Sequence, residues 1–408
     1  MDILPILSTL KRHKTAAGLI VLQIALTCAI VCNALFLISE RVATISAPTG
    51  MPDDALLMLR VVGLAKVDDA APQTQADLQA LRGLPGVSSV TVINQFPFGE
   101  NFNASGIRLE DNPNQRGITV ASYQAGPGWL QTFGLQLVEG RDFTPEEYQQ
   151  DDVVSSQAEP KVPAVILNKR VAERLFPGQS AVGKPVYVFS GNPQTVVGVL
   201  DTLVSPSPSG RDDANLNTMV LPVVPTYRSG YYLLRVADPA QREATLKAAA
   251  STLEKGSVGV RRLVREQRLF SELRADYYRQ DRAMVWLLGG VCLGLLIVTA
   301  FGIIGLASFW VQQRTRMIGT RRALGATEGQ ILRYFQAENF ILSSAGIALG
   351  MAGAYGISLL LMREYELPRL PIAYLPVGAL ILWTLGQIAV WAPARRAAAL
   401  APVAALRG

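Results

Sequence analysis

Four long apolar segments divide the chain, and one extended polar region separates the first of them from the other three. The segments are Ala16–Ser39, Ala283–Phe309, Ala337–Met362 and Ile372–Trp391. About 20 apolar residues span a bilayer as a helix, so this pattern predicts four transmembrane helices. The predicted organisation is an N-terminal interfacial helix at 1–15, transmembrane helices at 16–39, 283–309, 337–362 and 372–392, a large external domain at 40–282, a cytoplasmic loop at 310–336, a short external loop at 363–371 and a cytoplasmic tail at 393–408.

Basic residues cluster beside the apolar segments and predict their orientation. Lys11, Arg12 and Lys14 precede the first segment, an arginine cluster follows the second, and Arg395 and Arg396 follow the fourth. With four crossings, all three clusters lie on one side, which the positive-inside rule assigns to the cytoplasm. We therefore expect both termini in the cytoplasm. The same clusters account for the net charge of +6 better than nucleic-acid binding does.

Alternative explanations were considered for the first apolar segment, for two of its cysteines and for the single histidine. A signal peptide could explain the first apolar segment, but its length exceeds the usual 7–15-residue core, which favours a retained helix. Cys28 and Cys32 lie one helical turn apart inside that segment, where apolar packing explains them better than redox chemistry. His13 is the only histidine in the sequence, which argues against a zinc site or a histidine-based catalytic site, so we predict no metal.

The polar region alternates strand and helix patterns in a way that predicts an α+β domain. A strand at Leu56–Val62, a helix at Gln73–Leu84 and a strand at Val87–Ile93 form one β-α-β unit. A second unit follows much later: Tyr231–Val236, Pro239–Leu253 and Val258–Val264. We expect the two units to pack together as one lobe, with a β-rich second lobe around 140–221 inserted between them. The polar stretch 201–217 is predicted to be a mobile loop, and 269–282 a helical stalk that runs into the second membrane helix.

Gly178, Gly183 and Lys184 imitate the spacing of a nucleotide-binding phosphate loop. Pro185 occupies the position at which such a loop needs Ser or Thr for magnesium. The stretch also follows a predicted helix and precedes a predicted strand, which is the reverse of the order that a phosphate loop requires. The sequence therefore argues against nucleotide binding by this chain, and we expect no cofactor in it.

The loop between the second and third apolar segments carries the most specific turn chemistry. Gly325 can end a helix in the left-handed conformation at little steric cost. Thr327 with Gln330 fits a capping box, so a second helix should start there. Ile331 and Phe335 lie one turn apart and give that helix a short apolar face. This order predicts a helix–turn–helix element with a cationic first arm, although arginines in such a loop could also serve only to fix topology.

The residues R-T-R-M-I-G-T-R-R-A-L-G-A-T at 314–327, followed by Ile331, Phe335 and Glu338, resemble the signature loop of MacB/FtsX-type ABC transporter permeases. The segments 123–144 and 162–199 and the tail P-A-R-R-A-A-A-L-A-P-V-A-A-L-R resemble the same family. Gln313, Met317 and Thr320 depart from its pattern, and the first two replace residues that are commonly acidic. The resemblance implies a membrane protein with four transmembrane helices and a large α+β periplasmic domain between the first two, with both a porter-like and a β-rich lobe.

In this family the signature loop contacts the ATPase subunit. The resemblance therefore assigns that contact here to Arg314, Arg316, Ile318, Gly319, Arg321, Arg322, Leu324, Gly325, Ala326 and Thr327. It implies a non-catalytic permease of the inner membrane, with ATP and magnesium used by a separate ABC ATPase. A second permease completes a homodimer or a pair with a sister chain. Mechanotransmission to the periplasmic domain would drive efflux or export of a drug, peptide or toxin, together with a periplasmic adaptor and an outer-membrane channel.

Small residues recur at close-packing spacing in two of the apolar segments: Gly290 with Gly294, and Gly346 with Gly350. Such faces favour contact between helices, either within one chain or between two. Other functions remain open at this stage. A lipoprotein-releasing permease shares the layout, and an FtsX-like scaffold would instead regulate a cell-wall hydrolase or a signalling partner. No acid–base or nucleophile constellation points to an enzyme.

Overall fold

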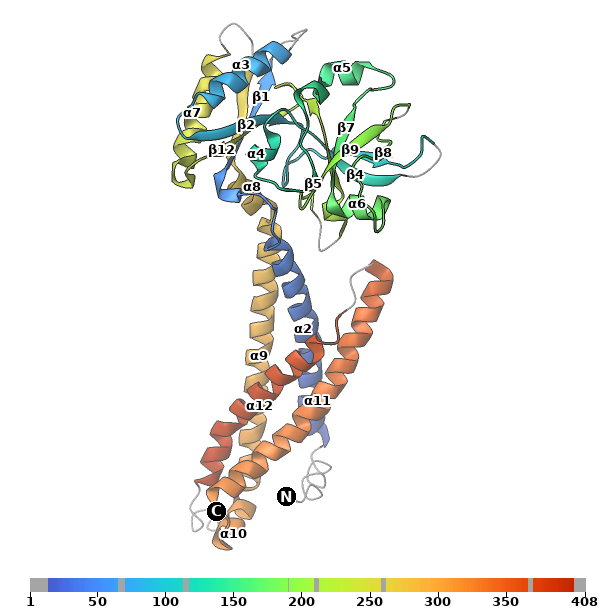
Figure 1. Ribbon diagram of the computed structural model, residues 1–408. Coiled ribbons are helices and arrows are strands. Elements are labelled where there is room, and N and C mark those ends of the chain that lie inside the picture. Colours follow the sequence, from blue (N-terminus) through green and yellow to red (C-terminus); the bar gives the residue numbers. More distant parts are fainter. Residues whose placement is uncertain are drawn as a thin grey trace. The chain divides into compact units, whose positions relative to one another are not determined.

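The computed structural model describes residues 14–64, 70–112, 117–189, 191–208, 213–257, 262–365 and 370–399. The chain divides into two compact units (Figure 1). Residues up to Val42 and from Asp281 onward form the helical unit, and Ala43–Gln280 form the α+β unit. Residues 1–13 of the interfacial helix predicted at 1–15, residues 366–369 of the short external loop and residues 400–408 of the C-terminal tail lie outside the described residues.

The helical unit consists of long apolar helices joined by short connections. In the described chain, four helices are long and apolar enough to cross a membrane. They are α2 (Lys14–Ile45), α9 (Arg279–Gln313), α11 (Glu328–Tyr365) and α12 (Tyr374–Ala398), and a short α10 (Thr315–Ala323) lies between α9 and α11. Each helix extends past its predicted apolar segment because polar residues continue the helix beyond the stretch that hydropathy marks.

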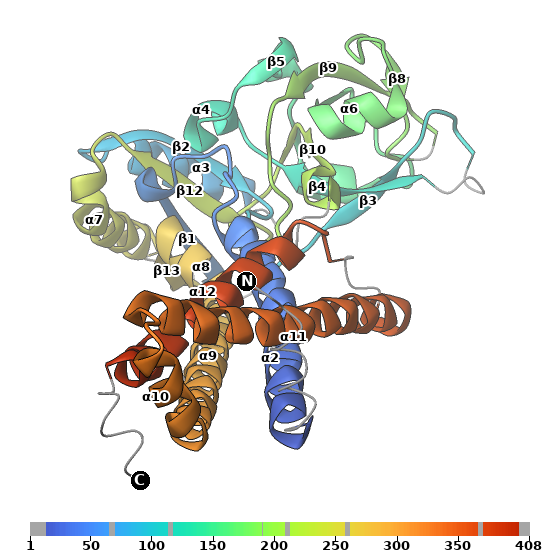
Figure 2. The same cartoon turned by 90° about the horizontal axis from the view of Figure 1, so that it is seen from below.

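Helix α2 contacts all three other long helices of this unit. Its Thr27 hydroxyl lies 2.8 Å from that of Thr299 in α9. The Cys28 thiol lies 3.8 Å from the Ile347 carbonyl oxygen of α11, and Cys32 packs against Gly378 of α12. Helices α11 and α12 cross and pack against one another (Figure 2). The two cysteines therefore serve as packing residues at helix interfaces.

The two β-α-β units pack together, as the sequence predicts, in one antiparallel sheet of the α+β unit. Its strand order is β13-β1-β12-β2. Helices α3 and α7 cover one face, where buried leucines and valines of both helices and all four strands meet. The elements are β1 (Leu56–Gly63), α3 (Ala71–Arg82), β2 (Val87–Ile93), β12 (Tyr231–Val236), α7 (Arg242–Lys255) and β13 (Arg262–Leu269).

The second lobe is a mixed sheet with the order β3-β4-β10-β7-β9-β5, and β8 adds to β9. Its short helix α6 (Lys169–Leu175) covers one face. The strands are β3 (Ala104–Ile107), β4 (Ile118–Gln124), β5 (Leu137–Gly140), β7 (Ala164–Asn168), β8 (Pro185–Val186), β9 (Gln194–Leu200) and β10 (Thr218–Leu221), with a small β6 (Gln149–Gln150) and β11 (Val223–Val224) pair and the helices α4 (Trp129–Phe133) and α5 (Asp151–Ser156). The lobe begins at β3, earlier than predicted.

A continuous apolar core joins the two lobes. Trp129 and Phe133 of α4 are almost completely buried in it, together with Met58 of the first sheet and Ile166 of the second. The Trp129 indole donates a 3.0 Å hydrogen bond to Asp142. Burial raises the pKa of this carboxyl above its ordinary value. The core explains why the inserted lobe does not behave as a separate domain.

Two sequence predictions for this unit are met only in part. The stalk predicted at 269–282 is helical from Phe270, as α8 (Phe270–Tyr277), but it does not run straight into the second membrane helix, because the helix breaks at Tyr278 before α9 starts. Phe270 and Leu273 of α8 are buried in the core, which ties that helix to the α+β unit. The predicted mobile loop is also largely packed, since Leu203 is 1% exposed and its neighbour Val204 accepts a hydrogen bond from Tyr123. Residues 209–212 of this stretch lie outside the described residues.

Residues 178–184, which match the residue spacing of a phosphate loop, lie between a helix and a strand, as the sequence predicts. Helix α6 precedes them and strand β8 follows them. Lys184 donates a 2.5 Å hydrogen bond to Gln179 and lies over the Phe176 ring, 4.6 Å from its centroid. Its ammonium group is therefore occupied by neighbours in the loop.

Candidate functional site

The turn after α10 has the backbone conformation that the sequence predicts. Gly325 has a φ of +94°. The Ala326 N–H donates to the Arg321 carbonyl oxygen at 3.0 Å, and the Gly325 N–H donates to that of Arg322 at 3.1 Å. This pair of bonds is a Schellman motif, which satisfies the last carbonyl groups of a helix. Helix α10 therefore ends in a fixed geometry.

The start of α11 is fixed by the predicted capping box. The Thr327 N–H donates to the Gln330 side-chain oxygen at 3.0 Å, and the Gln330 N–H donates to the Thr327 hydroxyl at 3.3 Å. Such reciprocal bonds satisfy two amide groups that a helix start leaves open. Because the stop and the start are only a few residues apart, the direction of α10 relative to α11 is closely defined.

One face of α10 is buried against the long helices. Ile318 is 2% exposed, and Gly319 beside it is buried. Ile331 and Phe335 of α11 are 5% and 4% exposed, so the predicted apolar face of this helix is confirmed. All three large side chains share one apolar cluster with alanines at the end of α12. Helix α10 is thus anchored on two long helices.

A buried ion pair adds a second anchor. Nη1 of Arg314 lies 3.0 and 2.8 Å from the two carboxylate oxygens of Glu338 in α11. The two side chains are 9% and 1% exposed. The sequence analysis placed Arg314 in an exposed cationic arm, and this is wrong, because the side chain turns inward to neutralise the one acidic residue at the edge of the third segment.

Several polar atoms around this pair lack partners. Among the described residues, Nη2 of Arg314, Nε1 of Trp310, Nδ2 of Asn339 and the Ser343 hydroxyl have no hydrogen-bond partner. The Arg314 guanidinium also lies over the Trp310 ring, 5.5 Å from its centroid. Buried polar groups are usually paired, and an unpaired one costs free energy. The anchor is therefore a polar cluster that is only partly satisfied.

The opposite face of α10 and the turn are exposed. Leu324 is 83% and Met317 is 38% exposed. Arg316 and Arg321 are also exposed, and the Arg321 guanidinium lies 5.0 Å from the centroid of the Tyr334 ring. Arg322 is 3.4 Å from Glu328. This surface combines cationic side chains with a large apolar one, a composition suited to contact with another protein.

The structure divides the ten predicted contact residues into two groups. Arg314, Ile318 and Gly319 are buried and hold α10 in place, whereas the others lie at the turn or on its exposed side: Arg316, Arg321, Arg322, Leu324, Gly325, Ala326 and Thr327. Sequence analysis missed the pairing of Arg314 with Glu338. One signal could have revealed it, because the two residues lie at similar sequence distances on either side of Gly325, as partners in a helical hairpin do.

The two predicted glycine pairs differ in their surroundings. A side chain at Gly346 would meet Ile24 of α2 at 2.8 Å, and one at Gly350 would meet Cys28 at 2.5 Å. At Gly290 and Gly294 a side chain would meet nothing within 4 Å in the described chain. The first pair therefore allows close contact between α11 and α2, and the second lies open on α9.

Two family models match the chain. Residues 18–252, more than half of the sequence, match the MacB-like periplasmic core domain. Residues 290–402 match the FtsX-like permease C-terminal domain, which includes α10 and the turn. Together the matches cover the two units of the structure and the candidate site.

Two curated relatives match most of this chain. The uncharacterized ABC transporter permease YknZ of Bacillus subtilis is 26% identical over 341 residues, which cover 82% of this chain and 79% of that protein. The macrolide export ATP-binding/permease protein MacB of Chromobacterium violaceum is 28% identical over 355 residues, which cover 84% of this chain. The match spans only 50% of the length of that MacB.

Among solved structures, the extracellular domain of the noncanonic ABC-type transporter YknZ is 20% identical, with a TM-score of 0.32, over 51% of this chain and 100% of that one. The periplasmic region of MacB from Actinobacillus actinomycetemcomitans is 15% identical, with a TM-score of 0.35, over 57% and 96%. The family matches and the four apolar helices fit a protein of the inner membrane. The chain belongs to the MacB/FtsX-type ABC transporter permeases, with a MacB-like periplasmic core domain joined to an FtsX-like permease domain.

Proposed function

We propose that this permease transmits force from a separate ABC ATPase to its own periplasmic domain. The observation that carries the proposal is the two-sided character of α10. One side is exposed, cationic and apolar, and the other is anchored on α11 and α12 through Ile318 and the Arg314–Glu338 pair. A short helix held in this way cannot move without displacing the long helices beneath it.

In this proposal ATP and magnesium belong to the partner ATPase, and the permease supplies no catalytic residue. The ATPase dimer engages the exposed face around Arg316, Arg321 and Leu324 on the cytoplasmic side. Binding of ATP would bring the two engaged faces together. The movement passes along α11 and α9 and reaches the periplasmic domain through the chain that continues from both ends of that domain. Both termini lie in the cytoplasm.

The permease acts as a pair, either as a homodimer or with a sister permease, because an ATPase dimer offers two equivalent docking positions. Gly290 and Gly294 lie open on α9 and are the small-residue face that we assign to this pairing. Efflux or export of a periplasmic substrate, together with an adaptor and an outer-membrane channel, is the use that the relatives named as macrolide exporters favour.

The test is charge reversal on the exposed face. Arg321→Glu with Arg322→Glu should weaken ATPase association at least about tenfold, because like charges across an interface cost several kcal/mol. The measurement is affinity purification of the full chain from native membranes in mild detergent, with quantitative mass spectrometry of the ABC ATPase. A matched control is Arg395→Glu with Arg396→Glu, which reverses two exposed charges at the end of α12.

Undiminished recovery of the ATPase with the Arg321/Arg322 variant, at normal expression of the chain, would remove the role that we assign to α10. The same experiment distinguishes between the three candidate functions of the permease. An adaptor among the recovered proteins favours efflux, bound lipoproteins favour a lipoprotein-releasing permease, and a cell-wall hydrolase favours an FtsX-like regulatory scaffold.

A further inference from the structure

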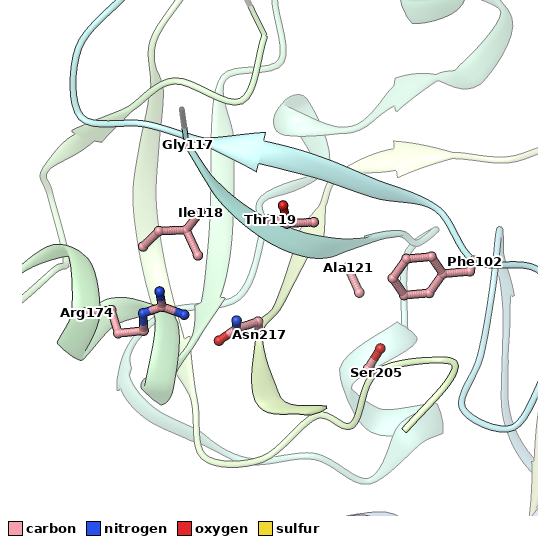
Figure 3. A pocket seen from close by; sticks show the side chains of 8 residues that line it. All are labelled: Phe102, Gly117, Ile118, Thr119, Ala121, Arg174, Ser205 and Asn217. Atoms are coloured by element: carbon pink, nitrogen blue, oxygen red, sulfur yellow. The ribbon is translucent and has the colours of Figure 1, made fainter. Parts of the chain in front are cut away.

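A cavity of about 510 Å³ opens on the second lobe of the α+β unit (Figure 3). Strand β4 contributes Ile118 and Thr119 to its lining, α6 contributes Arg174, and Asn217 precedes β10. Cavities of roughly 300–1,000 Å³ accommodate small organic ligands. The cavity is far in sequence from α10, and the coupling proposal does not use it.

Arg174 supplies the positive charge of this cavity. Its side chain is exposed, and it forms no ion pair within the part of the chain that the structure describes. Figure 3 shows its guanidinium directed toward the carboxamide of Asn217. A guanidinium presents its N–H groups in a planar fork that matches a carboxylate with two parallel hydrogen bonds. The cavity is therefore suited to an anionic group.

Asn217 supplies a hydrogen-bond acceptor that the fold leaves unused. The residue is 9% exposed, and its backbone carbonyl oxygen is held by the Ala121 N–H at 2.8 Å. Its side-chain Oδ1 has no donor among the described residues. A buried acceptor without a donor is unfavourable, and such a group in a native structure calls for an explanation. An N–H group of a ligand could donate the hydrogen bond that Oδ1 of Asn217 lacks.

The remaining lining adds an apolar contact and more positive charge. Phe102 is 55% exposed and lies beside Ala121, at the end of the cavity away from Ile118 and Arg174 (Figure 3). The same phenylalanine also lines an adjoining cavity of about 480 Å³, which contains Arg60 and Arg228 and the single carboxylate of Glu100. The combined lining therefore mixes apolar and polar side chains and is cationic on balance.

We propose that this cavity binds the carboxyl-terminal end of a short peptide with an apolar last residue. The free carboxylate pairs with Arg174. The N–H of the last residue, which is adjacent to that carboxylate in any peptide, donates to Oδ1 of Asn217. The apolar side chain packs on Ile118, beside Arg174, and the preceding residues of the peptide extend along the cavity toward Phe102 (Figure 3). A peptide end is the ligand class in which an anion, an N–H donor and an apolar group occur within one residue.

The probe is the tripeptide acetyl-Ala-Ala-Leu with a free carboxylate, and its control is the same tripeptide with a terminal carboxamide. Binding of both to the full-length chain in lipid nanodiscs is measured by isothermal titration calorimetry. We expect the carboxylate peptide to bind and the carboxamide to bind at least about tenfold more weakly, because charge-assisted hydrogen bonds to Arg174 are lost. Equal binding of the two peptides, or no binding of either at millimolar concentration, would overturn the proposal.

Three variants assign the binding to individual residues. Arg174→Gln should weaken binding of the carboxylate peptide about tenfold or more, and should not change binding of the carboxamide. Lys169→Gln removes one exposed positive charge from the same helix and should leave both unchanged. Phe102→Ala should weaken binding of both peptides in parallel, because it removes only apolar contact. An Arg174→Gln variant that binds the carboxylate peptide as the wild type does would contradict the assignment.

Discussion

Among the described residues, two arginine–carboxylate pairs are buried, one in each unit, and they differ in how completely their hydrogen bonds are made. In the α+β unit, Nη1 of Arg262 pairs with Asp77, Nη2 lies 2.7 Å from that carboxylate, and Nε donates to Ser257 at 3.0 Å. Asp77 also accepts from Tyr232 at 2.5 Å and from Gln73 at 3.2 Å. Both charged groups of this pair have several partners.

In the helical unit, the Arg314–Glu338 pair uses a single guanidinium nitrogen. Its Nη2 has no partner among the described residues, and Trp310 and Asn339 nearby also keep unpaired N–H groups. A fully satisfied buried network fixes one arrangement, whereas a partly satisfied one has other arrangements of similar free energy. The difference teaches that the first pair fixes one arrangement of its sheet, while the second leaves α10 an alternative arrangement, which the proposed coupling would require.

Tyr232 shows how closed the first network is. Burial, the neighbouring Asp77 charge and the hydrogen bond to it raise the pKa of the Tyr232 hydroxyl well above its ordinary value. The hydroxyl therefore stays protonated at every physiological pH and continues to donate to Asp77. The Arg262 guanidinium also lies over the Tyr227 ring, 5.1 Å from its centroid, which further encloses the pair.

The largest effect is expected for Arg262→Met, which leaves the Asp77 carboxylate buried without its partner. Breaking a buried pair in this way costs about 3–5 kcal/mol. Hydrogen–deuterium exchange of the full-length chain should show strands β12 and β13 losing protection. The double variant Asp77→Leu with Arg262→Met should recover most of the loss, because no unpaired charge remains. Wild-type protection in the single variant would contradict the role of this pair.

An intermediate effect is expected for Arg314→Met. The cost should be smaller, about 2–3 kcal/mol, because the wild-type guanidinium already lacks part of its hydrogen bonding. The readout is local: α10 should exchange its amide hydrogens faster, ATPase recovery should fall, and the α+β unit should keep its protection. If protection were lost equally in both units, the pair would be a general stabilising element and not an anchor for α10.

The smallest effect is expected for an exposed pair, Arg141 with Glu147, whose hydrogen bonds are 2.8 and 2.7 Å long. The hydrogen bond from Arg141 holds the pKa of Glu147 below its ordinary value, although partial burial acts in the opposite direction. A lowered pKa in the folded state means that the stabilisation is present at neutral pH and is lost as the pH falls through that lowered value.

Glu147→Gln should therefore cost below about 1 kcal/mol at pH 7. The difference between variant and wild type in urea unfolding should shrink as the pH is lowered from 5 toward 3. A cost that stayed constant over this range would show that the carboxylate charge contributes nothing. In that case the Arg141–Glu147 ion pair would not contribute to stability, and the comparison would be limited to the two buried pairs.

The sequence predicted the elements whose signals are local. Gly325 and the Thr327–Gln330 box predicted the turn, and hydropathy predicted the four apolar helices. Five of the six elements of the two β-α-β units were predicted within a few residues because their strand and helix patterns are regular. Residues 258–261 of the sixth, the strand predicted at Val258–Val264, lie outside the described residues, and β13 continues to Leu269. Each of these predictions depends only on residues that are neighbours along the chain.

What sequence analysis missed depends on packing between distant segments. The inward turn of Arg314 requires Glu338 on the next helix, so the arginine count alone suggested an exposed arm. The break at Tyr278 was missed because the charged, helix-compatible pattern continues across it, and the sequence does not show that Phe270 and Leu273 are buried in the core of the α+β unit. The burial of Leu203 similarly reflects strands that are far apart in sequence.

Site-specific photo-crosslinking in native membranes tests the central claim most directly. A photoreactive residue at position 324, where Leu324 is 83% exposed at the end of α10, is compared with one at position 138, where Val138 is 55% exposed in the α+β unit. The account predicts an adduct with an ABC ATPase from position 324 and none from position 138. No ATPase adduct from position 324, with the chain correctly inserted, would contradict the claim that α10 is the surface on which the ATPase acts.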